Sequence, residues 1–168
     1  MIADAARVRA FACSGGTSTA DVQGLRRYVQ GHLKTPSDNS SGQLARFFVQ
    51  RSQAKLRNLH DLPEDWDGAG SAAPNAEAIA NAAARLPELY RIGAAHAPWR
   101  EPHISANEDG EVSFEWWCGP RKITMYFGAS TIELIRVWGE NIQDEMSHVQ
   151  VNPDLDEFAQ AWPWLYMY

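Results

Sequence analysis

A chain of 168 residues is long enough to bury one sizeable core, and its 45% hydrophobic and 21% charged residues argue against wholesale disorder. The net charge of −6 is unevenly spread: residues 1–60 carry nine Lys and Arg against three acids, and the remainder carries six against eighteen. No apolar run approaches the roughly 20 residues that span a bilayer, no secretory signal is evident, and the two cysteines lie far apart, which predicts a cytoplasmic protein that does not enter membranes.

Two helices are predicted in the basic N-terminal part, after a segment over residues 1–17 that can be flexible. Over residues 18–34 a capping box precedes apolar residues at helical spacing. The polar stretch TPSDNSSG separates this helix from a second one. The second helix carries a broad apolar face from Leu44 to Leu59 and is expected to end before Pro63.

A third helix, a sheet and a last helix are predicted in the acidic part. Pro74 stands where helices begin, NAEAIANAAARL is rich in the best helix former, and Pro87 ends or kinks the helix. The runs PHISA, EVSFEWW, RKITMYFG and TIELIRVW have strand composition and are separated by the turn signals NEDG, CGP and GAS. Asn152 as N-cap and Pro153 in the first turn predict the start of the last helix.

These elements predict one α+β domain over residues 18–168. Its N-terminal helices are followed by an antiparallel meander of about four strands and by a C-terminal helix, with one face of the sheet covered by helices. The basic helical part spans residues 18–62 and the acidic helix-plus-sheet part spans residues 63–168.

The loop EDWDGAG supports two interpretations. In the structural one, Trp66 enters the core, Asp67 bonds the backbone that follows, and Gly68 and Gly70 supply unusual dihedral angles. In the catalytic one, Asp65 and Asp67 serve a small hydrolase or a metal-dependent enzyme as an acid/base pair or as ligands. Neighbouring residues of a turn point in different directions and no second ligand cluster is evident. We therefore favour the structural turn and predict no catalytic residue, no metal and no cofactor.

The basic helices predict a second kind of site. Their cations are numerous enough to neutralise several phosphates of a nucleic acid. The loop between the helices is too long for a helix-turn-helix, and the same cations can instead pack against the acidic part of the protein. The candidate nucleic-acid-binding residues are Arg26, Arg27, Arg46, Arg51, Lys55 and Arg57.

The acidic part predicts a third kind of site, a surface that binds a protein with a basic surface. Clustered carboxylates speed association with a positively charged partner, and exposed aromatic rings are frequent anchors of interfaces. Suitable partners are nucleases, toxins and nucleic-acid-binding complexes. The candidate interface residues are Trp99, Glu108, Asp109, Glu111, Trp117, Glu140, Asp144, Glu145, Trp164 and Tyr168.

From about Leu56 onward the chain resembles a poorly characterised bacterial and phage family. Members show a W-D-G-x-G-A turn, a proline-started helix and a later D-G-x-V-x-x-E-W strand. The matching residues are Trp66, Asp67, Gly68 and Gly70, with Ala72 one place late, and then Asp109, Gly110, Val112, Glu115 and Trp116. The resemblance implies the same order of helices and sheet and a home on mobile elements, and it brings no activity or catalytic residue.

The leading hypothesis is therefore a non-enzymatic protein that binds another protein. It would be an inhibitor of the anti-defence, immunity or antitoxin type, carried by a phage or another mobile element. The alternatives are a nucleic-acid-binding protein that uses the basic helices and an enzyme that uses Asp65 and Asp67.

Overall fold

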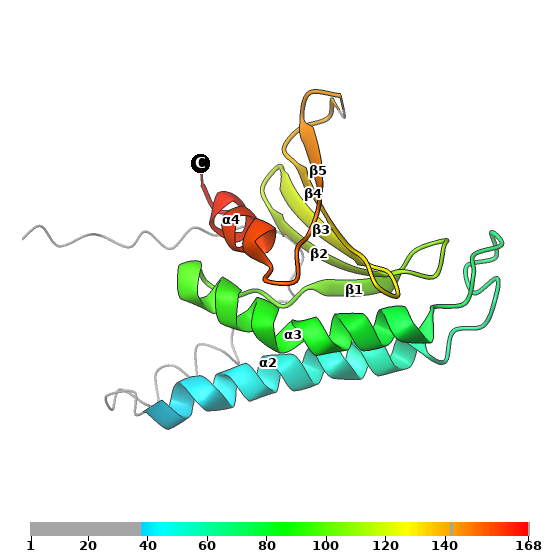
Figure 1. The fold of residues 1–168 in the computed structure, drawn as a ribbon, viewed down its shortest axis with the longest axis horizontal. Helices are drawn as coiled ribbons and strands as arrows, with labels where there is room; N and C mark the ends of the chain where they lie inside the picture. Colours follow the sequence, from blue (N-terminus) through cyan, green and yellow to red (C-terminus); the bar gives the residue numbers. More distant parts are fainter. Residues whose placement is uncertain (1–37, 142, 168) are drawn as a thin grey trace, which may run out of the picture.

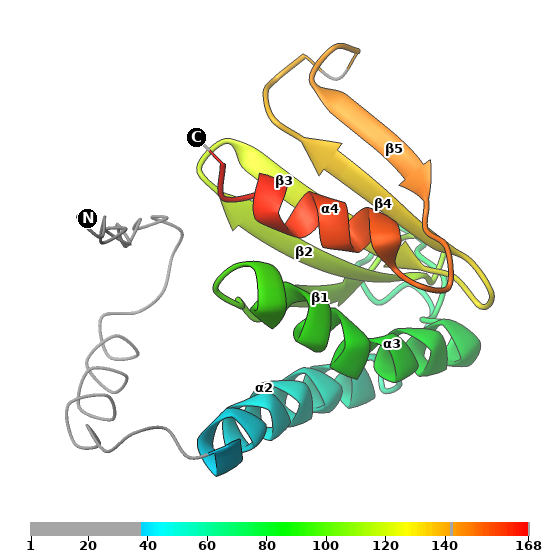
Figure 2. The same cartoon turned by 60° about the vertical axis from the view of Figure 1, so that its left-hand side comes forward.

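The structure is a computed structural model that describes residues 38–141 and 143–167. The segment over 1–17 and the helix predicted over 18–34 lie outside the described residues. The described part has the predicted α+β fold, with helices packed on an antiparallel sheet (Figures 1 and 2). Its elements in chain order are α2 (Asp38–Leu59), α3 (Ala76–His96), β1 (His103–Ala106), β2 (Val112–Cys118), β3 (Arg121–Phe127), β4 (Ile132–Val137), β5 (Met146–Gln150) and α4 (Asp156–Trp164).

The sheet is a meander in which strand order follows chain order, β1-β2-β3-β4-β5, and every neighbouring pair is antiparallel. Four strands match the predicted runs, and the fifth, β5, was not predicted. Its sequence, MSHVQ, has one β-branched residue and no aromatic residue, so it lacks the composition that marks a strand. Pairing with β4 makes it a strand, with Leu134 opposite Val149.

Helices α3 and α4 cover one face of the sheet, and α2 packs along α3 and reaches β1 (Figure 2). The covered face carries Phe114 and Trp116, which are almost fully buried. The ring of Trp116 lies 5.5 Å from that of Phe158 and 5.6 Å from that of Trp162, both on α4. Burial of such rings stabilises the fold, since deleting one costs about 3–5 kcal/mol.

Helix α3 starts and continues as its sequence requires. The Asn75 side chain is the N-cap and accepts hydrogen bonds from the backbone N–H groups of Glu77 at 2.8 Å and Ala78 at 3.2 Å. Pro87 lies inside the helix and does not end it. The Pro87 ring is exposed. Because proline has no backbone N–H, it donates no helical hydrogen bond to the carbonyl of Ala83, four residues earlier.

Helix α4 begins later than predicted. The Asn152 side chain accepts hydrogen bonds from the backbone N–H groups of Asp154 at 3.1 Å and Asp156 at 3.3 Å, so it closes a turn that precedes the helix. Leu155 follows in the left-handed conformation, with φ of 59°, and α4 starts only after it. Pro153 therefore lies in this turn and not in the first turn of the helix.

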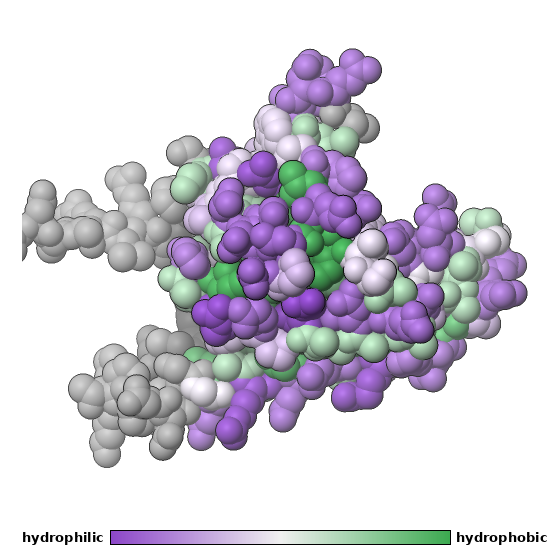
Figure 3. All heavy atoms as spheres, viewed as in Figure 1, coloured by the Kyte–Doolittle hydropathy of each residue, from purple (hydrophilic) through white to green (hydrophobic). Residues whose placement is uncertain are grey.

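Hydrophilic residues dominate the face seen in Figure 3, including the tip of the β4–β5 hairpin. Among the described residues the large exposed apolar side chains are Leu44 and Phe47 on α2, Trp117 on β2 and Met167. No helix in this part of the chain is both long and apolar enough to cross a bilayer.

Candidate functional site

One face of the sheet is left uncovered by the three helices that the structure describes. Side chains alternate along a strand, so Met125 and Leu134, which are buried against the helices, alternate with Tyr126 and Glu133 on the outer face. On β5, His148 points to the same outer face. Its Nε2 lies 2.9 Å from Oε2 of Glu133 on the neighbouring strand.

The loop over residues 62–73, called here the Asp67 loop, borders this outer face. The carboxylate of Asp67 accepts hydrogen bonds from the backbone N–H of Ala69 at 2.9 Å and from the Ser71 hydroxyl at 2.6 Å. The carboxylate of Asp65 accepts one from the backbone N–H of Gly70 at 2.7 Å. Both carboxylates therefore close the loop, which is the arrangement that the structural interpretation requires.

The backbone of the Asp67 loop depends on its glycines, but its tryptophan is not in the core. Gly68 and Gly70 have φ of 74° and 90°, a region that other residues rarely adopt. Trp66 is only half-buried and lies beside the outer face of the sheet, outside the core cluster. The prediction that Trp66 enters the core is wrong, because its ring lines the open space beside the β1–β2 turn.

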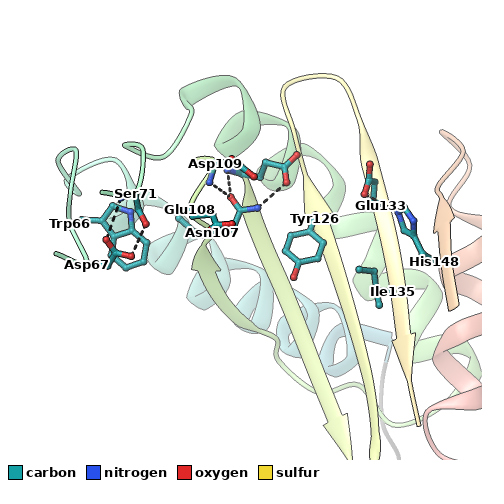
Figure 4. Close-up of a pocket in the computed structure, with 12 residues that line it drawn as sticks. Trp66, Asp67, Ser71, Asn107, Glu108, Asp109, Tyr126, Glu133, Ile135 and His148 are labelled. Atoms are coloured by element: carbon teal, nitrogen blue, oxygen red, sulfur yellow. Dashed lines mark hydrogen bonds and ion pairs between the residues drawn. The ribbon is translucent and has the colours of Figure 1, made fainter. Parts of the chain in front are cut away.

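The β1–β2 turn forms the next part of the site. The side-chain oxygen of Asn107 accepts hydrogen bonds from the backbone N–H of Asp109 at 3.1 Å and of Glu111 at 2.8 Å. The Asn107 amide donates to Oε2 of Glu111 at 2.9 Å. One asparagine thus fixes a turn from which the carboxylates of Glu108 and Asp109 project into solvent (Figure 4).

The Asp67 loop and the β1–β2 turn are held together by their backbones. The N–H of Ala72 donates to the carbonyl of Glu108, and the N–H of Asn75 donates to the carbonyl of Gly110, both at 2.8 Å. Gly110 has φ of 79°, and a Cβ there would stand only 2.6 Å from the carbonyl oxygen of Ala73. The contact therefore requires glycine at this position.

Together these elements form an open groove of about 560 Å³, called here the acidic groove (Figure 4). Five of its side chains are carboxylates, none is Lys or Arg, and one histidine is paired with one of the carboxylates. The groove thus offers a negative wall beside two aromatic rings. Its lining residues are Trp66, Asp67, Ser71, Ala106, Asn107, Glu108, Asp109, Glu111, Tyr126, Glu133, Ile135 and His148.

The electrostatics of the groove suit charge recognition better than proton transfer. The hydrogen bond from the Ser71 hydroxyl, together with that from the Ala69 N–H, lowers the pKa of Asp67 below its usual value. A carboxylate held in its ionised form is a poor proton donor near neutral pH. Among residues 38–141 and 143–167, no group of three or more His, Cys, Asp and Glu side chains has an arrangement that could hold a metal ion.

The predicted aromatic anchors have different surroundings. Trp99 is partly buried and packs against the core, 5.1 Å from Trp162 and 5.3 Å from Tyr90 between ring centroids, and its role as an interface anchor stays a prediction. Trp117 is 44% exposed on the outer face. Trp164 is half-buried against the guanidinium groups of Arg121 and Arg136, and Tyr168 lies outside the described residues.

The predicted acidic residues form two groups at opposite ends of the strands. Glu108, Asp109 and Glu111 lie at the β1–β2 turn and line the acidic groove. Glu140, Asp144 and Glu145 lie in the β4–β5 loop, at the other end of the strands by the register of the sheet. Part of the second group stabilises its own loop, because Asn141 bonds the carboxylates of Asp144 and Glu145.

The four candidate nucleic-acid-binding residues in the described part of the chain do not form one free basic surface. Arg51 and Lys55 form ion pairs with Glu101, at 3.3 Å and 3.1 Å. This arrangement matches the alternative in which helix cations pack against the acidic part. Arg46 and Arg57 are exposed on α2. Arg26 and Arg27 lie outside the described residues.

The sequence pattern missed the far wall of the groove. Tyr126, Glu133 and Ile135 were assigned to strands but not to a site, and His148 lies on the unpredicted β5. Alternation along β3 and β4 identifies which of these side chains face outward. Their proximity to the Asp67 loop depends on the tertiary fold, and no local signal reveals it.

Comparisons with known proteins add nothing to this geometry: no family model, no curated protein and no solved structure matches the chain. The resemblance stated from the W-D-G and D-G-x-V motifs stays an expectation.

Proposed function

We propose that the protein binds another protein through the acidic groove and that the partner presents a basic surface. The observation that carries this proposal is the lining of the groove, with five carboxylates and no Lys or Arg side chain. The Asp67 loop and the β1–β2 turn fix two of these carboxylates, those of Asp67 and Glu111, in place before any partner arrives. A preorganised negative surface lowers the ordering cost of association and steers a positive partner toward it.

The shape of the groove also favours a macromolecule over a small substrate. It is open to solvent, with Trp66 and Tyr126 in its walls (Figure 4). Sites for small molecules are enclosed and mostly apolar, whereas interfaces combine aromatic rings with a polar rim. The expected role is that of an inhibitor, encoded by a phage or another mobile element, which binds a basic target such as a nuclease or toxin.

A charge-neutralised variant tests this proposal. Glu108→Gln, Asp109→Asn and Glu133→Gln remove three groove charges, and none of these side chains closes the loop or the turn. Asp61→Asn, Glu140→Gln and Asp154→Asn make a matched control with the same net charge, because these exposed acids lie outside the groove. The probe is a short arginine-rich peptide, titrated at several salt concentrations.

The groove variant is expected to lose at least about tenfold in affinity at low salt, while the control variant binds like the parent. Equal losses in the two variants would mean that only net charge matters, and the proposed site would then be wrong. Binding that is unchanged in both would exclude the groove as the docking surface.

A further inference from the structure

The two edges of the sheet differ in how they are covered. At the first edge, α2 packs against β1, and the Lys55 ammonium donates to the carbonyl of Pro102 just before that strand, at 3.4 Å. At the other edge, β5 pairs with β4 on one side only (Figure 2). No helix in the described part of the chain runs along the outer side of β5.

The hydrogen bonds between β4 and β5 show which backbone groups of β5 face away from β4. The N–H of Val151 donates to the carbonyl of Ile132, and the N–H of Trp138 donates to the carbonyl of Glu145. In an antiparallel pair, hydrogen-bonded residues alternate with residues whose N–H and C=O point away from the partner. By this alternation the backbone groups at positions 146, 148 and 150 point away from β4, toward the open edge.

Within residues 38–141 and 143–167, this edge lacks the features that keep exposed strands from pairing. Proteins protect such edges with lysine, proline, bulges or a covering segment. The sequence MSHVQ has no lysine, proline or glycine, and the register with β4 is regular from Met146 to Gln150. The strand is therefore a ready template for one more strand.

We propose that β5 accepts an extended segment of the basic partner as a sixth strand of the sheet, with Lys or Arg at alternate positions. This inference rests on the proposed function, because it uses the same groove. The side chains of Met146, His148 and Gln150 point to the outer face, so alternate side chains of an added strand lie on that face too. His148 lines the acidic groove and bonds Glu133, whose carboxylate thus lies toward the open edge.

Charge distinguishes this occupant from a second copy of the chain. Two copies paired edge to edge would bring the Glu133 ends of two acidic grooves toward each other, and each copy carries a net charge of −6. A partner strand with cations at every second position instead directs positive charge at Glu133 while its backbone bonds the edge. Main-chain bonds then supply affinity and the alternate side chains supply specificity, as in other strand additions.

The test uses a ten-residue peptide of alternating arginine and threonine and the full chain, with amide exchange followed residue by residue. The N–H groups of His148 and Gln150 are expected to exchange quickly in the free protein and at least about tenfold more slowly with the peptide. Those of Ser147 and Val149 are protected by β4 in both states. In an added antiparallel strand the arginines lie opposite Met146, His148 and Gln150, so the N–H groups of the arginines face β5. An otherwise identical peptide, N-methylated at the arginines, keeps its charge and is expected to lose most of its binding.

A pair of variants makes the same test on the protein. Gln150→Pro removes an outward N–H and leaves the bonds to β4 intact, a position where an edge strand accepts proline. Gln150→Thr is the matched control, with a similar loss of the exposed side chain. Peptide affinity is expected to fall at least about tenfold for the proline variant only, with unchanged circular dichroism in both.

The outcomes separate this inference from the proposed function. Binding that depends on the groove charges but leaves the exchange of His148 and Gln150 unchanged would overturn the added strand and keep the groove. Binding that ignores the groove charges would overturn the proposed function. Protection of the same amides that appears without peptide and grows with protein concentration would show a second copy at the edge, and would also overturn the inference.

Discussion

Gly110→Ala tests the contact on which the groove depends. This glycine sits in the β1–β2 turn with φ of 79°, and its Cα faces the Asp67 loop. An added Cβ would stand 2.6 Å from the carbonyl oxygen of Ala73, which belongs to the backbone and has little freedom to move. The loop and the turn must then separate, which strains or breaks the bonds of Ala72 to Glu108 and of Asn75 to Gly110.

The cost follows from these two effects. A non-glycine residue in the left-handed region costs about 1–2 kcal/mol. Each of the two backbone hydrogen bonds contributes about 1 kcal/mol, so the total loss of unfolding free energy is about 3–4 kcal/mol. For a domain of this size that lowers the melting temperature by about 10 °C.

Gly68→Ala is the matched control in the same region. Gly68 has φ of 74°, close to that of Gly110, but a Cβ there meets nothing within 4 Å. Only the dihedral strain applies, so the expected loss is about 1–2 kcal/mol. Both variants are compared by thermal and denaturant unfolding, followed by circular dichroism. If Gly110→Ala destabilises the protein no more than Gly68→Ala, the proposed packing of loop against turn is wrong.

Three further changes test other parts of the structure. Gly93→Ala on α3 places a Cβ 2.5 Å from the Trp99 ring, so it should lower stability by at least about 2 kcal/mol and alter tryptophan fluorescence, whereas Gly42→Ala in open space should be neutral or stabilising. Asp67→Asn should destabilise the fold most at neutral pH and progressively less as pH falls through the lowered pKa of Asp67. The reason is that the ionised carboxylate stabilises the fold above its usual pKa and loses this contribution in acid. Denaturation curves that give the same difference in unfolding free energy between variant and parent from pH 7 to pH 3 would contradict this prediction. Burial raises the pKa of Tyr166 to about 12, so its stabilising contribution is complete below its ordinary pKa of 10 and is lost as pH rises toward 12; Tyr166→Phe should flatten this alkaline loss in unfolding measurements and remove the latest step of the tyrosine absorbance titration.

Local chemistry predicted the parts of the fold that depend on neighbours in sequence. Val112, Phe114 and Trp116 alternate with polar residues, and all three are buried on one face of β2. The Asp109-Gly110 pair marks a tight turn because glycine alone adopts the required φ at no cost, and the structure has the turn there. Such signals identify an element and its buried face.

The groove depends on relations that no local signal carries. β5 was missed because its residues are poor strand formers, and it is a strand only through its pairing with β4. Trp99 follows helix α3 and resembles an exposed anchor in sequence, yet a cluster of aromatic rings surrounds it. The acidic residues of the two turns look alike in sequence, and only the register of the sheet places them at opposite ends.

The order of the strands has a consequence for how the chain assembles during synthesis. Loops of two to eight residues join each strand to the next, so closing them costs little entropy and every pairing can form soon after a hairpin leaves the ribosome. The last helix is different, because Phe158 and Trp162 must travel back to pack beside α3 and the rings of β2. Until Phe158 and Trp162 have packed there, the apolar rings of β2 stay exposed to water, and an intermediate that lacks this contact is prone to aggregate.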